Sequence, residues 1–369
     1  MKALAPLAAV LLLAAPAAAQ SEYQRDMDFA LEQLEARCGS FFETKRIDWK
    51  QVSKEMRKAA QEVENDQQHL VLLTRLLARL HDGHAEVRKL AGAEDVVWPE
   101  DGLFGTGVER GDSGLALCRV GRKIYVKVAL GPAQDAQLKP GSEVLKIDDE
   151  KPEQWLEDRI AGYGDLLSWS TPQQAYFWVT HWGLSGPAGG RIKLEVKEPD
   201  GKKKKRTLTL GSSRLRTVGP AVWPEGLQTE GEVSWTTLEG GFGYIYLRRC
   251  RGEVVEQMDA ALAALGEVPG LILDFRGNGG GGFDHDALLG RFVPAGQELS
   301  FAKRIPSAGP RNYGGPVVVL ADATTVSAGE TGSGMFKEEG RALMLGDSAT
   351  AGMSSSKETV ELPSGRFEL

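Results

Sequence analysis

A short segment rich in hydroxyl groups is the first place where this sequence could do chemistry. Residues 321–330 read ADATTVSAGE, and Ser327 stands where a buried apolar run ends and a helix is expected to begin. A serine at a helix N-terminus lies near free N–H groups and the positive end of the helix dipole, which favour an alkoxide or oxyanion. Ser327 followed by Glu330 also has the spacing of a capping box. The segment predicts a nucleophile or a plain helix cap, and the two roles are compatible.

A glycine-rich loop is the second candidate. Residues 273–282 read LDFRGNGGGG, at the end of a predicted buried strand. Gly277, Gly279 and Gly282 satisfy the G-x-G-x-x-G spacing of dinucleotide sites, but a run made only of Gly and Asn matches it easily, and no clean acidic residue ends a second strand about 20 residues on. Such a loop also exposes backbone N–H groups that can stabilise an oxyanion. A tight turn without chemistry is the third reading, and no cofactor is expected.

A serine nucleophile needs a base, and the chain has few histidines. The five are His69, His81, His84, His181 and His285. His84 follows an expected helix end at 81–83, so it should lie in a loop, where a histidine of no role is the competing reading. His285 comes just after the glycine-rich loop and is a rival base. Two histidines three residues apart, without a partner motif, are poor support for a metal site, so none is expected.

A second glycine motif lies earlier in the chain. Residues Leu103, Phe104, Gly105, Thr106 and Gly107 form the sequence LFGTG. Its glycines could let backbone amides curl around a carboxylate. An ordinary turn explains the same residues equally well.

The elements that must position these residues fall into three regions. Residues 22–95 have apolar side chains at helical spacing and predict a helical N-terminal domain whose last helix ends at 81–83. Residues 100–212 change to short strands, among them 115–120 and 124–128. A stretch with Gly-Pro and Pro-Glu-Gly, residues 213–235, is expected to be a linker.

From about residue 236 the pattern becomes α/β. Strands are predicted at 243–247, 271–275, 317–321 and 342–345, and helices at 254–265 and from 327 onward. Strands that alternate with helices indicate a parallel sheet with crossover helices. The fold class is therefore an α/β multidomain protein.

The first residues have the pattern of a signal peptide. Lys2 precedes an apolar run from Leu4 to Ala15, and residues 17–19 are an A-x-A cleavage site. Residues 1–19 are thus predicted to be a signal peptide, with an exported mature protein in the periplasm or outside the cell. The later sequence has no run long enough to span a membrane, so no stable membrane insertion is expected after cleavage.

Charge and cysteine content exclude other classes. The formal net charge of −7 argues against a nucleic-acid surface. Cys38, Cys118 and Cys250 are too scattered for a zinc motif of the CxxC kind. They are expected to be small buried hydrophobic residues, or to include one disulfide.

Taken together, these motifs resemble the tail-specific, or C-terminal processing, serine peptidase family. The resemblance runs in the family's order from the strand and loop at 273–281, through 318–322 and Ser327-Ala328-Gly329-Glu330, to 340–346 and Thr350-Ala351-Gly352. It implies a crotonase-like α/β protease domain over 236–369 and a PDZ-like β-rich domain over 100–212. In the latter, Leu103 to Gly107 resembles the carboxylate-binding loop. Polypeptide substrates are the implied partners.

The branch of the family decides the implied mechanism. One branch uses a Ser/Lys dyad, but the region after Thr350 has no lysine in the matching context, and Lys357 is the nearest candidate. The tricorn-like branch uses a histidine of the N-terminal domain, and Asp82-Gly83-His84 is similar to that segment. The resemblance thus implies Ser327 as nucleophile, His84 as general base, and the N–H groups of Ala328 and of Gly280, or a neighbouring glycine, as oxyanion hole.

Two departures from the branch bear on this expectation. Gly83 stands where the branch often has a serine, and the branch uses a glutamate beyond the position at which this chain stops, so the protease domain is expected to be incomplete at its C-terminal end. Glu361 is a poor substitute. The alternative function is a catalytically inactive peptide-binding protein that keeps both folds.

Overall fold

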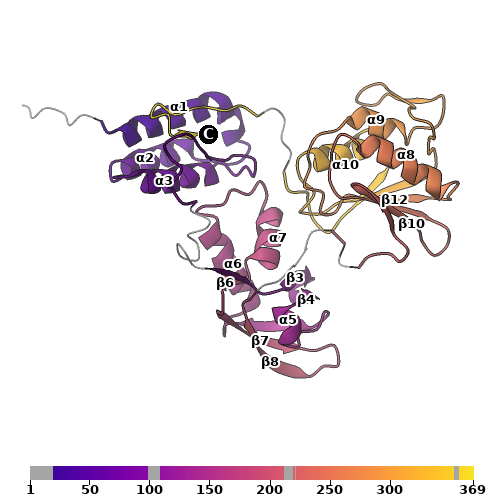
Figure 1. Cartoon of the computed structure of the whole chain (residues 1–369), viewed down its shortest axis with the longest axis horizontal. Helices are drawn as coiled ribbons and strands as arrows, with labels where there is room; N and C mark the ends of the chain where they lie inside the picture. The colour runs from indigo at the N-terminus through magenta and orange to yellow at the C-terminus, as the bar shows by residue number, and fades with distance from the viewer. Residues whose placement is uncertain (1–19, 99–108, 212–218, 221, 353–356) are drawn as a thin grey trace, which may run out of the picture.

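The structure is a computed structural model that describes residues 20–98, 109–211, 219–220, 222–352 and 357–369. Figure 1 shows three bodies: a helical unit, a middle unit with a sheet and two long helices, and a third unit built on a larger sheet. The predicted signal peptide, residues 1–19, and the predicted carboxylate-binding loop, Leu103 to Gly107, lie outside the described residues. In the described part of the chain, no helix is both long and apolar enough to span a membrane.

The N-terminal unit consists of three helices, as expected. They are α1 (Glu22–Phe42), α2 (Trp49–Ala60) and α3 (Asp66–Ala78). Each begins after a polar residue whose side chain accepts a hydrogen bond from the N–H three residues on: Ser21, Asp48 and Asn65. The third helix ends earlier than the predicted 81–83, because His81 takes the left-handed conformation with φ 51° and begins the loop that carries His84.

The last residues of the chain return to this helical unit (Figure 1). Strand β17 (Phe367–Glu368) pairs antiparallel with β1 (Arg88–Lys89). Leu362 and Phe367 are buried in the core that the three helices form. The predicted protease domain, 236–369, includes this segment, and in the structure its end packs two apolar side chains against the helices.

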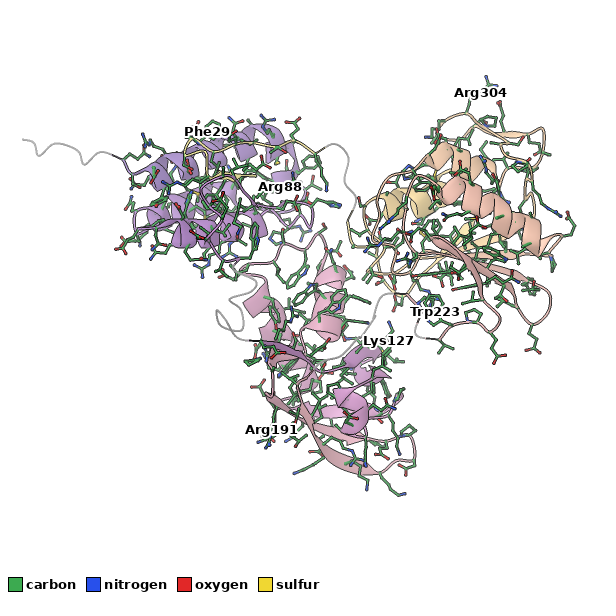
Figure 2. The ribbon with its side chains drawn as sticks, in the orientation of Figure 1. Phe29, Arg88, Lys127, Arg191, Trp223 and Arg304 are labelled. Carbon is green, nitrogen blue, oxygen red and sulfur yellow. The ribbon has the colours of Figure 1, made fainter. Side chains whose placement is uncertain are left out.

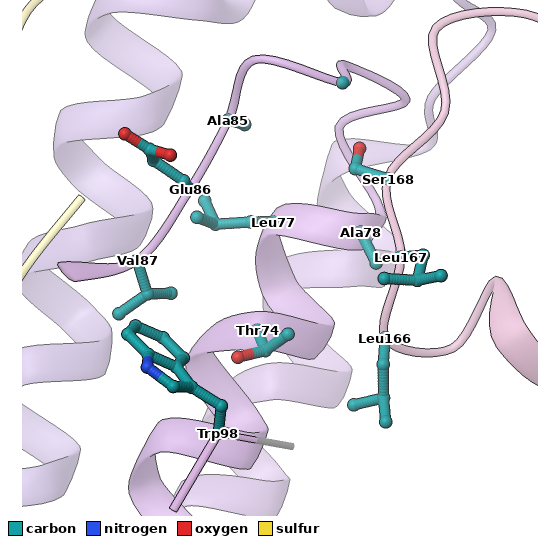
Figure 3. Close-up of a pocket in the computed structure, with 11 residues that line it drawn as sticks. Thr74, Leu77, Ala78, Ala85, Glu86, Val87, Trp98, Leu166, Leu167 and Ser168 are labelled. Carbon is teal, nitrogen blue, oxygen red and sulfur yellow. The ribbon is translucent and has the colours of Figure 1, made fainter. Parts of the chain in front are cut away.

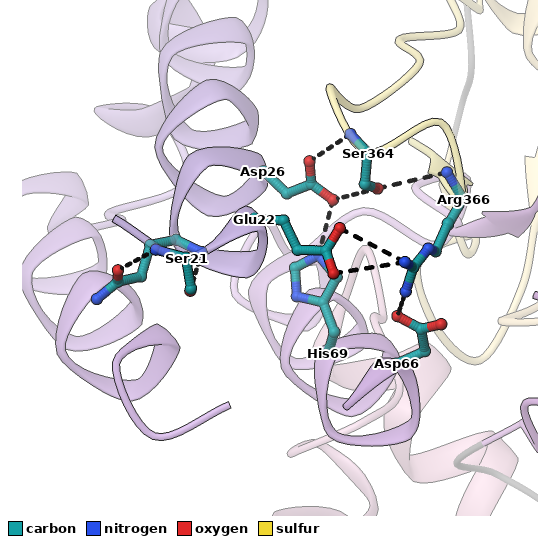
Figure 4. Close-up of polar contacts among 8 residues, drawn as sticks. Ser21, Glu22, Asp26, Asp66, His69, Ser364 and Arg366 are labelled. Carbon is teal, nitrogen blue, oxygen red and sulfur yellow. Dashed lines mark hydrogen bonds and ion pairs between the residues drawn. The ribbon is translucent and has the colours of Figure 1, made fainter. Parts of the chain in front are cut away.

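Polar contacts hold the returning segment in place (Figure 4). The Ser364 hydroxyl and N–H donate to the buried carboxylate of Asp26, at 2.6 and 2.8 Å. His69 Nε2 lies 3.1 Å from the same carboxylate, and Arg366 forms ion pairs with Glu22 and Asp66. Hydrogen bonds from His69 and Ser364 outweigh the effect of burial and lower the pKa of Asp26. The C-terminal segment and the first helix are thus one structural body.

The middle unit is a five-stranded sheet of order β3-β4-β5-β7-β8 with all neighbours antiparallel. Its strands are β3 (Leu115–Val120), β4 (Lys123–Ala129), β5 (Glu143–Ile147), β7 (Arg191–Lys197) and β8 (Lys203–Thr209). A two-stranded ribbon, β2 (Arg110–Asp112) with β6 (Ser185–Pro187), and a short helix α5 (Pro132–Asp135) complete it. The strand predicted at 115–120 is present as such, and the one predicted at 124–128 is one residue longer at each end.

Two helices of this unit were not expected from the sequence. They are α6 (Pro152–Tyr163) and α7 (Pro172–Trp182), and each has a proline in its first turn, where the missing N–H costs nothing. In Figure 1 they lie on the side of the middle unit that faces the other two units. The segment 164–171 between them therefore reaches the junction of all three bodies.

The third unit is a six-stranded sheet of order β16-β15-β12-β11-β10-β9. Its strands are β9 (Gln228–Glu230), β10 (Val233–Thr237), β11 (Gly243–Leu247), β12 (Leu271–Asp274), β15 (Val317–Leu320) and β16 (Leu343–Leu345). The four strands from β11 to β16 are parallel, and β10 and β9 are antiparallel. Because β9 and the start of β10 fall within 213–235, that stretch is not wholly a linker: the sheet already begins there.

Three helices accompany the parallel strands: α8 (Val254–Leu265), α9 (His285–Gly290) and α10 (Ala328–Glu338). A small ribbon of β13 (Glu298–Leu299) and β14 (Ile305–Pro306) lies between α9 and β15 in the sequence. Figure 2 shows the side chains of the three units, with Phe29 on the helical unit, Arg191 on the middle unit and Arg304 on the third. Parallel strands end at one edge of a sheet, so the loops that follow β12 and β15 lie side by side.

Candidate active site

Ser327 lies at a sharp turn between β15 and α10. Its backbone has φ 57° and ψ −126°, a conformation that costs a non-glycine residue about 1–3 kcal/mol. A strained turn from strand to helix exposes the nucleophilic serine in α/β hydrolases. The Ser327 side chain makes no capping hydrogen bond. A plain helix cap therefore does not account for this serine.

The glycine-rich loop after β12 packs directly against this turn. Gly280 has φ 81°, and a Cβ placed on it would lie 2.7 Å from the Cβ of Ser327 and 2.8 Å from the carbonyl oxygen of Val326. Any side chain at 280 would collide with the serine and its neighbour. Glycine is required at this position by the close approach as well as by the positive φ.

Asn278 is the polar centre of the loop. Its side chain is fully buried, donates to the carbonyl of Leu247 at 3.0 Å and accepts from the N–H of Gly280 at 2.9 Å. The backbone carbonyl oxygen of Asn278 accepts a hydrogen bond from the N–H of Val326 at 3.0 Å. These bonds join β11, the glycine-rich loop and the Ser327 turn, so the two loops that the sequence singled out form one structure.

The backbone donors near Ser327 differ in availability. Ala328 is the first residue of α10, and the N–H groups of a first helical turn have no acceptor within the helix. The N–H of Gly280 is already donated to Asn278. Among the hydrogen bonds of the described residues, none uses the N–H of Gly281, which follows directly. Ala328 together with Gly280 or Gly281 thus offers N–H groups beside the serine.

Glu330 connects the turn to the strand-like segment at 350–352. Burial raises the pKa of its carboxyl group, while Thr350 and the N–H groups of Gly352 and Ser327 act in the opposite direction. The N–H of Ser327 donates to the carbonyl of Gly352 at 2.9 Å, and the N–H of Glu330 donates to the carbonyl of Ser327 at 2.9 Å. The backbone of Ser327 is therefore bonded on one side to Gly352 and on the other to Glu330.

The loop that carries His84 meets this site through one serine of the middle unit. The N–H of Gly83 donates to the Ser170 hydroxyl at 3.0 Å. The same hydroxyl lies so close to Gly352 that a Cβ there would overlap it. Because Gly352 is hydrogen-bonded to Ser327, the histidine loop and the nucleophile are separated by Ser170 and one glycine. The sequence contained no signal for Ser170.

His84 is largely buried, with 14% of its side chain exposed. Burial lowers its pKa and Lys357 adds to this effect, while the carboxylates of Asp82 and Glu86 act in the opposite direction. A lowered pKa keeps the imidazole neutral near pH 7, the form that can accept a proton. No hydrogen bond joins His84 to Ser327 within the described residues.

The other histidines have different surroundings. His285 Nε2 lies 3.3 Å from the carbonyl oxygen of Ala328, beside the nucleophile, which leaves it a rival base. His181 is buried among α7 residues with Lys127 Nζ 3.4 Å away, and burial together with this cation lowers its pKa to about 3. His69 belongs to the Asp26 cluster described above.

A pocket of about 490 Å³ opens beside the His84 loop (Figure 3). One wall is formed by Leu166, Leu167 and Ser168 of the middle unit, and the floor by α3. The remaining lining residues include Gly83, Ala85, Glu86, Val87 and Trp98. The histidine loop is thus bordered by surfaces of two units.

Of the three cysteines, Cys250 contacts the glycine-rich loop, with its Sγ 3.4 Å from Asn278 Oδ1. Cys38, Cys118 and Cys250 are all free, so the bridge that the sequence left open is not formed. Cys250 is buried, and burial raises its pKa to about 12. Among the residues that the structure describes, no group of three or more His, Cys, Asp or Glu side chains is placed to hold a metal ion.

The fold and the serine turn define a class of protein, a serine peptidase. Residues 241–367 match the model of peptidase family S41, so the chain carries a serine peptidase domain of this family over these residues. The match spans both loops that meet at Ser327.

Solved structures extend the likeness over most of the chain. Mature CPAF superposes with a TM-score of 0.65 at 14% identity, covering 94% of this chain and 87% of that one. CPAF complexed with lactacystin gives 0.64 at 15% identity, with coverage of 94% and 88%. The photosystem II D1 C-terminal processing protease gives 0.42 at 19% identity, with coverage of 94% and 86%. Because the CPAF superpositions cover 94% of this chain, the likeness to the CPAF fold includes all three units.

Proposed function

We propose that this protein is an endopeptidase that cleaves unfolded or C-terminally exposed polypeptides, with Ser327 as nucleophile and His84 as general base. The observation that carries the proposal is the strained turn of Ser327, at the carboxyl edge of a parallel sheet and in contact with a glycine-rich loop. Strain of this kind persists only where the surrounding structure enforces it, and it is concentrated at functional sites.

The reaction follows from the groups at the turn. Ser327 Oγ attacks the scissile carbonyl carbon as its proton passes to His84, and the carbonyl oxygen becomes an oxyanion. His84 then gives the proton to the amine nitrogen as the C–N bond breaks, which leaves an acyl-enzyme. Water, deprotonated by His84, hydrolyses that ester. The lowered pKa of His84 suits a base at neutral pH.

The proposed oxyanion hole is formed by the N–H of Ala328 and a glycine N–H of the facing loop. Gly280 is the first choice, because a Cβ placed on it would lie 2.7 Å from the Cβ of Ser327. Since its N–H is donated to Asn278, either this bond opens when substrate binds or the N–H of Gly281 serves. Donors of this kind contribute about 3–4 kcal/mol each to transition-state stabilisation.

The middle unit is proposed to be PDZ-like and the third unit crotonase-like. Strand β3 is the edge strand of its sheet, and α7 packs beside it, an arrangement that suits the addition of an extended peptide as a further strand. Leu103, Phe104, Gly105, Thr106 and Gly107 are proposed to bind the substrate carboxylate. Export to the periplasm or the outside of the cell remains part of the proposal, on the strength of residues 1–19.

A peptide-binding protein without turnover is the second candidate. The absence of a hydrogen bond between His84 and Ser327 in the described residues favours it, as does the engaged N–H of Gly280. Catalytic hydrogen bonds are often long in ligand-free enzymes and tighten with substrate. Peptide hydrolysis therefore has to be measured directly.

The test is covalent labelling of the purified full chain with a fluorophosphonate probe, beside Ser327→Ala. Wild type should be labelled and Ser327→Ala should not, and cleavage of an unfolded reporter polypeptide should fall by 10⁴-fold or more, as is typical of lost nucleophiles, about 10⁶ in the extreme. Equal labelling of the two proteins would contradict the nucleophile. Labelled wild type without any reporter cleavage would favour the peptide-binding alternative.

The base is tested by His84→Ala and His285→Ala as a matched pair. The first should lose activity by roughly the same factor as Ser327→Ala, because residues of one catalytic unit are not additive. The second should remain active, since its ring contacts a backbone carbonyl. The reverse result would transfer the role to His285.

A further inference from the structure

One carboxylate lies beside the buried nitrogen of His84. Asp82 Oδ1 is 3.6 Å from His84 Nδ1 and accepts a hydrogen bond from the His84 backbone N–H at 2.9 Å. His84 Nδ1 itself is buried and has no hydrogen-bond partner among the described residues. A buried polar nitrogen without a partner costs about 1–3 kcal/mol, so it marks a bond that forms in another state of the site.

Asp82 is fixed from two sides. Its N–H donates to the Ser168 hydroxyl at 2.8 Å, which ties it to the middle unit. Lys45 Nζ lies 3.5 Å from Asp82 Oδ2 and donates to the carbonyl of His81 at 2.9 Å. One carboxylate oxygen thus faces a lysine and the other faces the histidine. Asp82 Oδ1 is therefore placed to accept a hydrogen bond from the N–H of the His84 imidazole.

The other charges near His84 are less suited to this role. Glu86 is bonded to Arg88 by Nε at 2.9 Å and by the terminal nitrogen at 2.6 Å, and its side chain is 59% exposed. Lys357 is a cation and cannot accept a proton from the ring. Glu361, the substitute that the sequence offered, has an isolated bridge with Glu368.

We propose that Asp82 is the positioning acid of His84, so that the site works as a Ser327–His84–Asp82 triad within the function proposed above. A rotation of the ring that shortens 3.6 Å to about 2.8 Å lets Nδ1–H donate to Asp82 Oδ1. Nε2 is then the unprotonated nitrogen that can accept the Ser327 proton. Asp82 stays ionised throughout: the proton moves from Ser327 Oγ to Nε2, and from Nε2 to the leaving amine.

The test is the isosteric change Asp82→Asn in the full chain, with Glu86→Gln as the matched control. With Asn at position 82, the His84 tautomer protonated at Nε2 becomes more populated, and this form cannot accept the serine proton. The kcat on the reporter polypeptide should therefore fall by about 10²- to 10⁴-fold, with KM little changed. Glu86→Gln removes the same charge from the same loop, but its exposed position predicts a change within about twofold. Thermal unfolding of both variants verifies that they fold.

The pH profile separates positioning from mere structure. Asp82 and Glu86 both raise the pKa of His84, with Asp82 the larger influence, and Lys357 lowers it. Losing the Asp82 charge lowers this pKa, so the acidic limb of kcat/KM should move to lower pH in Asp82→Asn, and less in Glu86→Gln. The imidazole ¹⁵N shifts of His84 should show protonated Nδ1 in wild type and less of it in Asp82→Asn.

Ser168→Ala is the second variant, because it removes the acceptor of the Asp82 N–H and leaves the charge. It should lower kcat by about tenfold and leave the acidic limb in place, since a displacement of about 1 Å costs up to about 10²-fold. If His84→Ala is inactive while Asp82→Asn matches wild type in kcat and pH profile, the triad is overturned and the proposed base stands. If His84→Ala is active, the base itself is wrong.

Discussion

The proposed nucleophile, Ser327, and the proposed base, His84, lie in different surroundings. Ser327 is enclosed within one unit, where Asn278, Gly280 and Glu330 hold its turn through buried contacts. His84 lies on a loop between units, where Ser168 and Ser170 accept backbone N–H groups of its neighbours. One half of the site is preformed by local packing, and the other depends on how three bodies meet.

Because of this difference, the Ser327 turn is held rigidly, whereas the position of His84 can change. A rigid nucleophile half can retain strain only because the sheet and two loops resist relaxation. A base on a junction can be moved by small displacements of the middle unit, whose segment 164–171 lies against it. Because that unit is also the proposed peptide binder, substrate binding has a direct structural route to the position of His84.

The largest effect is expected from Gly280→Ala, which breaks the nucleophile half. The new Cβ would overlap the Ser327 turn, and the positive φ adds about 1–2 kcal/mol. Fluorophosphonate labelling should slow by about 10³-fold, the upper range for a lost oxyanion donor. Gly279→Ala is the matched control, because a Cβ there meets nothing within 4 Å. Similar rates for the two variants would contradict the close packing.

The second-largest effect is expected from a change in the core of the helical unit, which carries His84. Phe367→Ala empties a fully buried position in the helical core and should lower the free energy of unfolding of that unit by about 3–5 kcal/mol. Phe41→Ala, on the same unit but with its side chain 58% exposed, should change it by about 0.5 kcal/mol or less.

Thermal melts measure the stability of both phenylalanine variants. In folded Phe367→Ala, fluorophosphonate labelling of Ser327 should fall less than cleavage of the reporter polypeptide. Equal loss of labelling and cleavage would mean that the nucleophile half also depends on the C-terminal segment. Unchanged stability would show that Phe367 is not part of the core.

A smaller effect is expected from Ser170→Ala, which removes a hydroxyl that contacts both Gly83 and Gly352. Loss of the acceptor for the Gly83 N–H should let the His84 loop shift and lower kcat by about tenfold, with labelling of Ser327 by small probes less affected. Ser234→Ala, a hydroxyl on β10 bonded to Thr229, is the control. An unchanged kcat would show that the junction does not position the base.

The smallest effect is a pH dependence of stability. Although burial raises the pKa of the Asp26 carboxyl, hydrogen bonds from His69 and Ser364 lower it below its ordinary value in the folded protein. A carboxyl group with a depressed pKa contributes stability above its unfolded pKa, and that stability is lost as pH falls through the folded pKa. Below about pH 4, the free energy of unfolding of wild type should therefore fall more steeply than that of Asp26→Asn. Circular dichroism during an acid titration measures this difference. Parallel acid curves would contradict the role of this carboxylate.

Local patterns predicted much of the third unit. The strands at 243–247 and 271–274, the helix at 254–265 and the turn at Ser327 follow from runs of apolar residues, helical spacing and glycine. These features depend on neighbours in the sequence, and periodicity reports such neighbours well. The glycine-rich loop and the serine were singled out for the same reason.

Longer-range features were not predictable in this way. The return of the C-terminal segment to the helical unit joins Asp26 to Ser364 across 338 positions, and no local pattern says which core a short apolar segment enters. The helices α6 and α7 were missed in a region where strand signals dominated. The roles of Ser168 and Ser170 arise only because α7 places its preceding segment at the junction.

By itself, the sequence determined which residues could react: a serine at a strand-to-helix turn, a glycine loop with free N–H groups, and a histidine after an acidic residue and a glycine. Tertiary structure alone decided how they are combined, because the strain at Ser327 requires the packed edge of a parallel sheet. It also decided that Asp82 lies beside His84, since two residues in one loop become partners only when Lys45 and Ser168 hold the loop in that shape.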